Sequence, residues 1–284
     1  SKGTSRSQQL KTLASGDCQM IIGTHALFQD DVEYKSLGLI IIDEQHRFGV
    51  HQRLTLKDKA NNTGLSPHQL IMTATPIPRT LAMSAYADLD NSIINELPIG
   101  RLPIDTAIVS NQRRGDVVKA IKKACTGGNQ AYWVCTLIEE SEALSIEAAE
   151  VTAEQLSKLL PDISIGLIHG RMKPEEKKSV MTNFREKLIQ VLVATTVIEV
   201  GIDFPNANLI IIENANKFGL AQLHQLRGRV GRGEKQGFCI LMFKGSLSKN
   251  ARKRIQILRN SDDGFFIAEE DMKLRGFGDL IGFK

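Results

Sequence analysis

Two carboxylates follow an apolar stretch in the first sixth of the chain. Residues 39–42 are entirely apolar and lead directly into Asp43 and Glu44. In open α/β folds, ligands bind at the carboxyl ends of parallel strands. There Asp43 would hold Mg²⁺, largely through its water ligands, and Glu44 would orient and deprotonate the water that attacks a γ-phosphate. An acidic loop that caps the next helix is the alternative.

Hydroxyl side chains end the next apolar stretch, residues 69–72. Thr73 and Thr75 could hydrogen-bond Glu44 or His46 and so transmit the state of the nucleotide. Taken alone, the segment is typical of a turn in which hydroxyls bond the backbone before a helix. Because it accompanies the acidic strand end, we favour the functional interpretation.

Residues 225–233 contain three arginines separated by glycines. Such a segment suits neither a helix interior nor a core. Glycine allows a close approach of the backbone to a ligand, and arginine offers forked donors to phosphate. Arg229 and Arg232 are therefore candidate arginine fingers for a γ-phosphate. A basic, solvated turn is the alternative.

A segment with two threonines and an aspartate follows the predicted strand 190–194. Thr195 and Thr196 could bond a nucleic-acid phosphate. The turn that follows them ends at Gly201, and Asp203 would lie near the nucleotide ribose.

Two histidines occupy similar positions. His169 and Gly170 follow the predicted strand 163–168, and Thr24 and His25 follow the predicted strand 19–22. Phosphate contact and a purely structural role both stay open for these residues.

The elements that must position these residues alternate between short apolar runs and longer amphipathic stretches. This alternation predicts an α/β fold with a parallel sheet flanked by helices. Predicted strands are 19–22, 37–42, 69–72, 106–109, 130–134, 163–168, 190–194, 209–212 and 237–242. Predicted helices are 79–88, 113–125, 141–160, 174–186, 220–229, 248–259, with Ser248 as N-cap, and 265–274.

A stretch with two prolines and a glycine interrupts this series at residues 96–103. It divides the chain into a first α/β domain, 1–98, a linker, 99–105, a second α/β domain, 106–245, and a helical hairpin with a loop, 246–284. The first domain has few strands for an open sheet and is predicted to be incomplete.

The overall composition restricts the class of protein. The formal charge of +4, from 36 basic and 32 acidic residues, is compatible with nucleic acid but does not establish it. The four cysteines form no zinc-ligand pattern and are expected to be buried thiols in a reducing cytoplasm. No apolar stretch reaches the length of a membrane span, so we expect no membrane association.

In sequence order, the motifs resemble those of superfamily 2 helicases. Residues 43–46, 73–75, 195–203 and 225–232 resemble motifs II, III, V and VI, and residues 23–25 resemble motif Ib. Residues 43–50, 75–80 and 218–225 are similar to only two groups, the RecG family of branch-migrating helicases and the transcription-repair coupling factors. Gln45 and the segment 132–141 favour the RecG family.

The resemblance implies a fold of two RecA-like domains and an ATP- and Mg²⁺-dependent activity. It implies a catalytic set of Asp43, Glu44, Gln45, His46, Arg229 and Arg232, and nucleotide contacts from Gly201, Asp203 and Gln225. The hairpin and loop are similar to the motif that couples ATP turnover to movement along duplex DNA, with Arg275 in the coupling role. A hairpin that only packs on the second domain is the alternative. Phe277 and Asp279 stand where the family usually has Pro and Glu, which leaves the loop's conformation open.

By this resemblance, we expect a double-stranded DNA translocase that remodels stalled forks and branch-migrates Holliday junctions in repair and recombination. Its expected setting is the bacterial cytoplasm and nucleoid, as a monomer with single-strand-binding protein as a further partner. The sequence contains no G-x-x-x-x-G-K-[ST] phosphate loop, so we expect this chain alone to bind ATP weakly and hydrolyse it negligibly. The motor of a coupling factor and a non-catalytic nucleic-acid-binding module are the alternatives.

Overall fold

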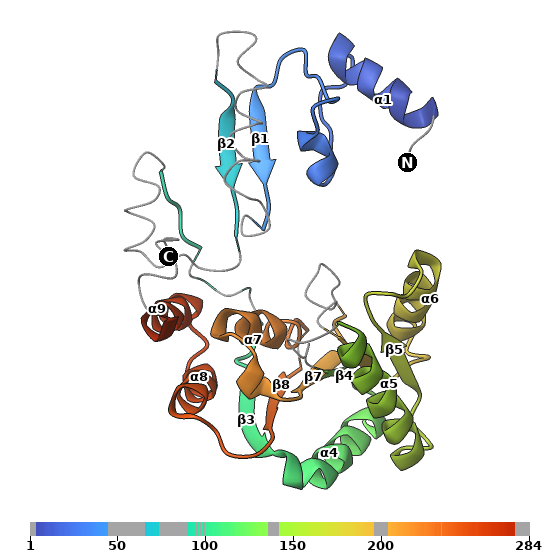
Figure 1. Cartoon of the computed structure of the whole chain (residues 1–284), viewed down its shortest axis with the longest axis vertical. Helices are drawn as coiled ribbons and strands as arrows, with labels where there is room; N and C mark the ends of the chain where they lie inside the picture. The colour runs from blue at the N-terminus through green and yellow to red at the C-terminus, as the bar shows by residue number, and fades with distance from the viewer. Residues whose placement is uncertain are drawn as a thin grey trace. The chain divides into compact units, whose positions relative to one another are not determined.

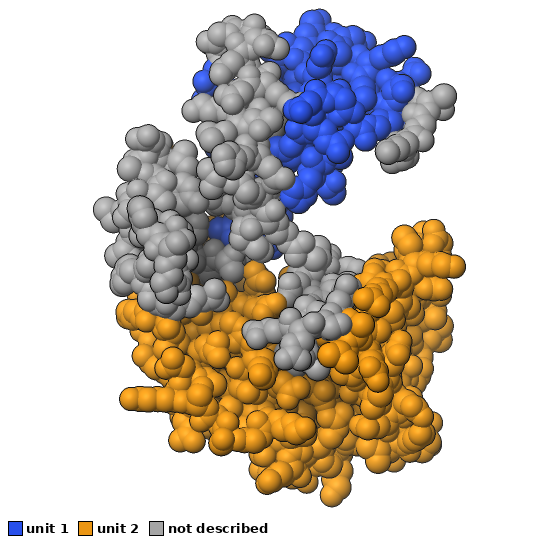
Figure 2. All heavy atoms as spheres, viewed as in Figure 1, with its two compact units in different colours: residues 1–76 blue, residues 77–284 orange. Residues whose placement is uncertain are grey.

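The computed structural model describes residues 4–44, 66–73, 90–94, 96, 98, 100–135, 142–195, 204–233 and 235–275. The chain divides into two compact units, residues 1–76 and residues 77–284 (Figure 2). Within the described part, no helix has the length and apolar character needed to cross a membrane. The predicted helix 79–88 and the loop after residue 275 lie outside the described residues.

The first unit is built on a small parallel sheet. Its elements are α1 (Thr4–Ser15), the 3-10 helix η1 (His25–Phe28), β1 (Leu39–Ile42) and β2 (His68–Ile71). Along β1 the side chains alternate: Ile40 and Ile42 are buried against Phe28, Tyr34 and Leu37. The opposite face stays exposed through Leu39, Ile41, Leu70 and Met72.

The second unit is a six-stranded, all-parallel sheet in the order β3-β8-β7-β4-β6-β5 (Figure 1). Its strands are β3 (Asp105–Ser110), β4 (Gln130–Val134), β5 (Ile165–Ile168), β6 (Val191–Ala194), β7 (Ala207–Ile212) and β8 (Phe238–Phe243). Its helices are η4 (Asn111–Arg113), α4 (Arg114–Thr126), α5 (Glu142–Leu159), α6 (Pro174–Arg185), η6 (Ala215–Lys217), α7 (Leu220–Arg227), α8 (Lys249–Asn260) and α9 (Gly264–Arg275).

Helices cover both faces of this sheet. Every residue of the central strands β4, β6 and β7 is buried, as expected for strands between two helical layers. One apolar core joins the sheet to α4 and α5, and a second joins it to α6, α7, α8 and α9. The predicted α/β architecture of parallel strands flanked by helices is confirmed.

Most predicted strands and helices are found within a few residues of their predicted bounds. The predicted strand 19–22 is wrong, because these residues form no strand and Met20 and Ile22 are 79% and 87% exposed. Apolar character alone suggested it, but among the described residues β1 pairs only with β2. Helix α1 was not predicted because its sequence is mainly polar. The helix buries the apolar side chain of Leu13.

The hairpin of α8 and α9 packs on the second unit. Ala251, Ile255 and Leu258 of α8 are buried in line with the predicted helix face. Ser248 caps α8 as predicted, since its Oγ accepts a hydrogen bond from the Ala251 amide at 3.2 Å. Asp263 begins α9 in a similar way, accepting from the Phe265 amide at 2.8 Å.

Replacing Ser248 with alanine is expected to lower the free energy of unfolding by about 1 kcal/mol, because an amide at the start of α8 loses its acceptor. Urea denaturation measures this change. Ser246→Ala is the matched control, since Ser246 is exposed and caps no helix. Equal effects of the two variants would show that the cap contributes no stability.

Candidate active-site and nucleic-acid-binding residues

The carboxylate pair lies at the carboxyl end of β1. Ile42 pairs with Ile71 of β2, and the Met72 amide donates to the Ile42 carbonyl at 2.8 Å. Continued by two residues, this register aligns Thr73 with Glu44 along the chain, and the predicted hydrogen bond between them stays a prediction.

The backbone at Glu44 adopts an unusual conformation. Its φ is +52°, in the left-handed region, and its amide donates to Oδ1 of Asp43 at 2.8 Å. A non-glycine residue with such a φ is uncommon and costs about 1 kcal/mol or more, and such residues concentrate at functional sites. Asp43 is exposed and Glu44 is half-buried, so the two carboxylates have different surroundings.

The donor chemistry at this edge fits Mg²⁺. The cation usually takes one or two carboxylates and completes its shell with water and substrate phosphates. The exposed carboxylate of Asp43 provides such an oxygen ligand. Within the ranges that the structure describes, no cluster of three His, Cys, Asp or Glu side chains could hold a metal by protein ligands alone.

Thr24 and His25 are placed differently from the prediction. They do not follow a strand; Thr24 precedes η1 as its N-cap residue without a side-chain cap bond, and His25 is the first residue of η1. The His25 ring lies 6.3 Å from the Phe28 ring, between centroids. His25 is nevertheless exposed and accessible to a ligand.

In the second unit, the carboxyl ends of neighbouring strands bring several polar residues together. Ile168 pairs with Ala194, so His169 and Thr195 follow adjacent strands, and the Thr195 amide donates to the Ile168 carbonyl at 3.3 Å. His169 is half-buried, and its buried Nδ1 has no hydrogen-bond partner among the described residues. The Gly170 carbonyl accepts from Nζ of Lys177, and Thr195 is only 4% exposed.

The same edge carries a cluster that was not predicted. Glu213, which follows β7, forms an ion pair with Arg114 at the start of α4. The Arg114 guanidinium lies over the Trp133 ring, 4.6 Å from its centroid. The Cys135 thiol donates to Glu213 Oε2 at 3.8 Å, and burial, followed by the charge of Glu213, raises the pKa of Cys135 to about 12. Cys135 is therefore a neutral, unreactive thiol.

The other cysteines are also free thiols. Burial raises the pKa of Cys125 to about 11 and that of Cys239 to about 12. Cys125 and Cys239 are buried as predicted, whereas Cys18 is partly exposed.

The arginine-rich segment begins within α7 and continues beyond it. Gln225 and Arg229 are half-buried. Arg232 is exposed, and its Nε donates to the Gly228 carbonyl at 3.1 Å. These three side chains are thus at least partly accessible, as the predicted phosphate contacts require.

Arg227 differs from the other two arginines. The segment was predicted to be poor core, but Arg227 is only 2% exposed. Its Nη1 donates to the carbonyls of Leu258 and Ser261 and lies 3.1 Å from Oδ1 of Asp262. Arg227 therefore joins α7 to the turn between α8 and α9, and burial lowers its pKa.

The glycines of the segment serve backbone packing within the unit. Gly231 has a φ of +71°, and a Cβ at Gly237 would lie 2.9 Å from the Gly231 Cα. A Cβ at Gly233 would lie 2.8 Å from the Pro205 carbonyl oxygen. At these positions a side chain would separate backbone segments that are in contact.

His224, in α7, predicts a pH dependence of stability. Burial, and next the charge of Arg227, lower its pKa from 6.5 to about 4. The unfolded chain binds a proton at this residue as pH falls below 6.5, whereas the folded chain does so only near 4. Folding stability therefore falls as pH drops from 6.5 towards 4, by at most about 3 kcal/mol, and this residue adds no pH dependence above 6.5.

His224→Gln is expected to remove this loss of stability between pH 6.5 and pH 4, because glutamine does not titrate. Urea denaturation of both proteins between pH 7 and pH 4 measures the difference in free energy of unfolding. Parallel pH profiles for the two proteins would contradict a half-buried His224 that stays neutral to about pH 4.

Six of the predicted site residues lie outside the described ranges. They are Gln45, His46, Thr75, Thr196, Gly201 and Asp203. Arg275 ends α9, and its side chain is not described. The roles of all these residues stay predictions.

Two family models match the chain. Residues 1–84 match the DEAD/DEAH box helicase model, and residues 116–234 match the helicase conserved C-terminal domain. The matches cover the carboxylate pair and the arginine-rich segment respectively.

Curated relatives match over the whole chain. It is 60% identical over 284 residues to the ATP-dependent DNA helicase RecG of Haemophilus influenzae and 59% identical over 282 residues to that of Escherichia coli strain K12. These alignments cover 100% and 99% of this chain but only 41% of each relative. The chain thus spans about two fifths of the length of these relatives.

Solved structures agree with these relationships. A structure of RecG bound to a three-way DNA junction matches with a TM-score of 0.74 and 42% identity, over 99% of this chain and 36% of that chain. Saccharomyces cerevisiae Dbp5, bound to RNA and ADP BeF3, shares only the fold, with a TM-score of 0.57 and 16% identity over 88% of this chain and 66% of that chain. The chain is similar, over nearly its whole length, to about two fifths of these RecG helicases.

Proposed function

We propose that this chain is the motor portion of an ATP-dependent DNA helicase that moves along duplex DNA and acts on branched DNA. The observation that carries the proposal is 60% identity across the entire chain to a RecG helicase. A homologous RecG structure holds a three-way DNA junction, which supports forks and Holliday junctions as the substrate class. Action in repair and recombination on the bacterial chromosome, in the cytoplasm, follows as part of the proposal.

In the proposed reaction, Glu44 orients and deprotonates the water that attacks the γ-phosphate of ATP. Asp43 holds Mg²⁺ largely through water, and the bound cation neutralises phosphate charge. Gln45 and His46 belong to the same catalytic segment by resemblance. Support comes from the exposed carboxylate of Asp43 and the constrained backbone of Glu44.

Arg229 and Arg232 are proposed to donate hydrogen bonds to the γ-phosphate as charge builds up in the transition state. Gln225, Gly201 and Asp203 are proposed to contact the nucleotide. The partial exposure of Gln225 and Arg229 and the exposed position of Arg232 support accessible donors.

The remaining predicted residues are proposed to contact nucleic acid or to couple its movement to ATP turnover. His169 has a buried ring nitrogen without a partner among the described residues, so a phosphate or ordered water would satisfy it. Thr195 requires a local opening to reach a phosphate because it is 4% exposed. The proposed set is Thr24, His25, Thr73, Thr75, His169, Gly170, Thr195, Thr196 and Arg275.

Unwinding by the full-length protein tests the function. We expect ATP hydrolysis to be stimulated by a three-way DNA junction and the junction to be separated into its strands in an ATP-dependent manner. Displacement of a stalled RNA polymerase without junction unwinding would instead favour a coupling factor. DNA binding without hydrolysis would favour a non-catalytic module. Monomeric state and binding to single-strand-binding protein are separate proposals, tested by light scattering and by co-purification.

A further inference from the structure

Helix α8 has an unusual charge composition. Its twelve residues include five arginines or lysines and no aspartate or glutamate. The formal net charge of the whole chain is +4, so the rest of the chain is close to neutral. By contrast, α6 combines its cations with Glu175 and Glu176, as a solvated helix surface commonly does.

The exposed side chains of α8 are all cationic or amide groups. They are Lys249, Asn250, Arg252, Lys253, Gln256, Arg259 and Asn260. Lys249, Arg252, Gln256 and Arg259 follow a spacing of three, four and three residues, which places them in one stripe along the helix. The stripe is about 15 Å long at 1.5 Å per residue.

The helix is held firmly on the second unit. Ser248 caps its start, and Arg227 binds the Leu258 carbonyl near its end. Arg254 Nη2 donates to the Asn216 carbonyl at 3.1 Å, and Lys253 lies 3.4 Å from Glu270. These contacts use two of the five cations to fix the helix.

The three cations of the stripe are not used in this way. Within the described part of the chain, Lys249, Arg252 and Arg259 make no side-chain hydrogen bond or ion pair. Arg252 and Arg259 line a groove of about 390 Å³ together with Gln256, Gly245 and Ser246. Ile108, Phe243 and Leu247 also line this groove.

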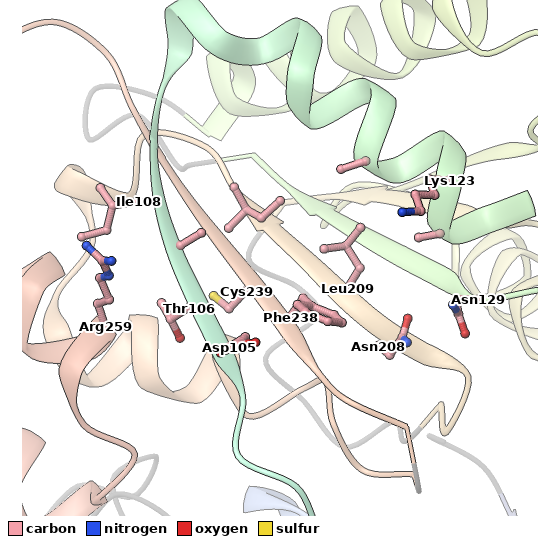
Figure 3. Close-up of a pocket in the computed structure, with 14 residues that line it drawn as sticks. Asp105, Thr106, Ile108, Lys123, Asn129, Asn208, Leu209, Phe238, Cys239 and Arg259 are labelled. Atoms are coloured by element: carbon pink, nitrogen blue, oxygen red, sulfur yellow. The ribbon is translucent and has the colours of Figure 1, made fainter. Parts of the chain in front are cut away.

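A second, larger hollow lies past the end of the stripe. Arg259 also borders a larger hollow of about 750 Å³ between α4 and the strands β3, β7 and β8. Lys123 of α4 lines the same hollow, at the opposite side from Arg259 (Figure 3). The hollow thus has a cation on each of two sides, with the carboxylate of Asp105 of β3 also in its lining.

We infer that the stripe of Lys249, Arg252, Gln256 and Arg259 is a binding surface for the phosphate backbone of duplex DNA. It is distinct from the predicted site residues at the strand ends and deepens the proposed function, on which it rests. Arginine and amide donors are the groups that proteins direct to phosphate oxygens. A 15 Å stripe corresponds to about four base-pair steps at roughly 3.4 Å each.

Nucleic acid fits this surface better than an acidic peptide does. A peptide partner normally adds apolar anchors that fill pockets. Here the apolar groups beside the stripe are half-buried, and Ile108 and Leu247 already pack against the core of the unit. The phosphate backbone of nucleic acid carries a regularly repeated negative charge, and it can bind to the row of cationic and amide donors without apolar anchors.

The test neutralises the stripe in the full-length protein through Lys249→Gln, Arg252→Gln and Arg259→Gln together. Each phosphate contact contributes about 0.9 to the slope of log K against log salt on duplex DNA. We expect the slope to fall by about 2 to 3 and the affinity in roughly 0.1 M salt to fall on the order of a hundredfold, equally for different duplex sequences. Lys119→Gln, Lys158→Gln and Lys178→Gln, which remove the same charge from α4, α5 and α6, are the matched control and should change neither quantity.

Two results would overturn the inference. One is an unchanged slope in the stripe variant at an unchanged melting temperature; the other is an equal fall of the slope in the control variant. Binding of poly-L-glutamate is measured in parallel, and its loss with retained DNA affinity would assign the stripe to acidic peptides. Failure of the proposed function is distinguishable, since the unmodified protein would then neither bind junctions nor hydrolyse ATP.

Discussion

Glu44→Gln in the full-length protein is expected to lower the turnover number of ATP hydrolysis by a factor of roughly 10² to 10⁴, the usual contribution of a general base. Glutamine keeps the size of the side chain but cannot accept a proton from the attacking water. ATP affinity should change little, because contacts to the nucleotide do not require the base. Steady-state hydrolysis and nucleotide binding, measured separately, give the two quantities.

The substitution of Glu44 by glutamine leaves the backbone strain at this position unchanged. A φ of +52° has the same steric cost for glutamine as for glutamate, so the substitution adds no backbone strain. Glu33→Gln is the matched control, since Glu33 is an exposed carboxylate of the same unit with no proposed role. Unchanged hydrolysis in Glu44→Gln would remove the base assignment, and a parallel loss of ATP binding would indicate a structural role.

Local sequence patterns predicted the strands of the second unit well because these strands are buried and therefore continuously apolar. Gln130–Val134 and Val191–Ala194 are buried along their entire length, and continuous apolar character is what such strands require. The same reasoning failed at residues 19–22, where Met20 and Ile22 are apolar but exposed. Apolar character predicts a strand only where a neighbouring strand is present to pair with it.

Contacts between distant positions could not be predicted from one sequence. Arg114 and Glu213 are 99 residues apart, and only the order of strands in the sheet brings their side chains together. The alignment of Thr73 with Glu44 was predictable, because parallel strands that follow one another often have their carboxyl ends at the same edge. Site residues at strand ends could therefore be predicted from the sequence. Their partners on helices, such as Arg114, could be identified only from the three-dimensional fold.

Arg227 illustrates the same limit within a motif. The whole segment, Arg227 included, was predicted to be poor core, yet the Arg227 side chain points into the protein and is 2% exposed. The signal that could have separated it is its position in α7, four residues after the buried Leu223 and seven after the buried Leu220, on the same helix face. A helix face that continues an apolar stripe is buried even when one member is charged.

Arg227→Ala is expected to lower the free energy of unfolding by about 3 kcal/mol, because it removes a buried cation with three contacts. The carbonyl of Leu258, a fully buried residue, would lose its side-chain donor. Urea denaturation measures the loss, and hydrogen exchange of residues 249–275 shows whether α8 and α9 loosen. Arg259→Ala, at an exposed arginine of the same hairpin, should leave both measurements within experimental error.

Arg227→Lys separates charge from geometry. All three acceptors converge on Nη1 of Arg227. Lysine keeps the positive charge, but its ammonium ends one bond nearer the backbone and so falls short of these acceptors. We therefore expect most of the stability loss to persist in Arg227→Lys. If stability and exchange stayed unchanged while ATP hydrolysis fell, Arg227 would act at the nucleotide rather than as the link to the hairpin. If stability and ATP hydrolysis fell together in both variants, the segment that carries Arg229 and Arg232 would depend on the hairpin for its position. Arg227 would then link the proposed ATP chemistry to α8, the helix proposed to bind duplex DNA.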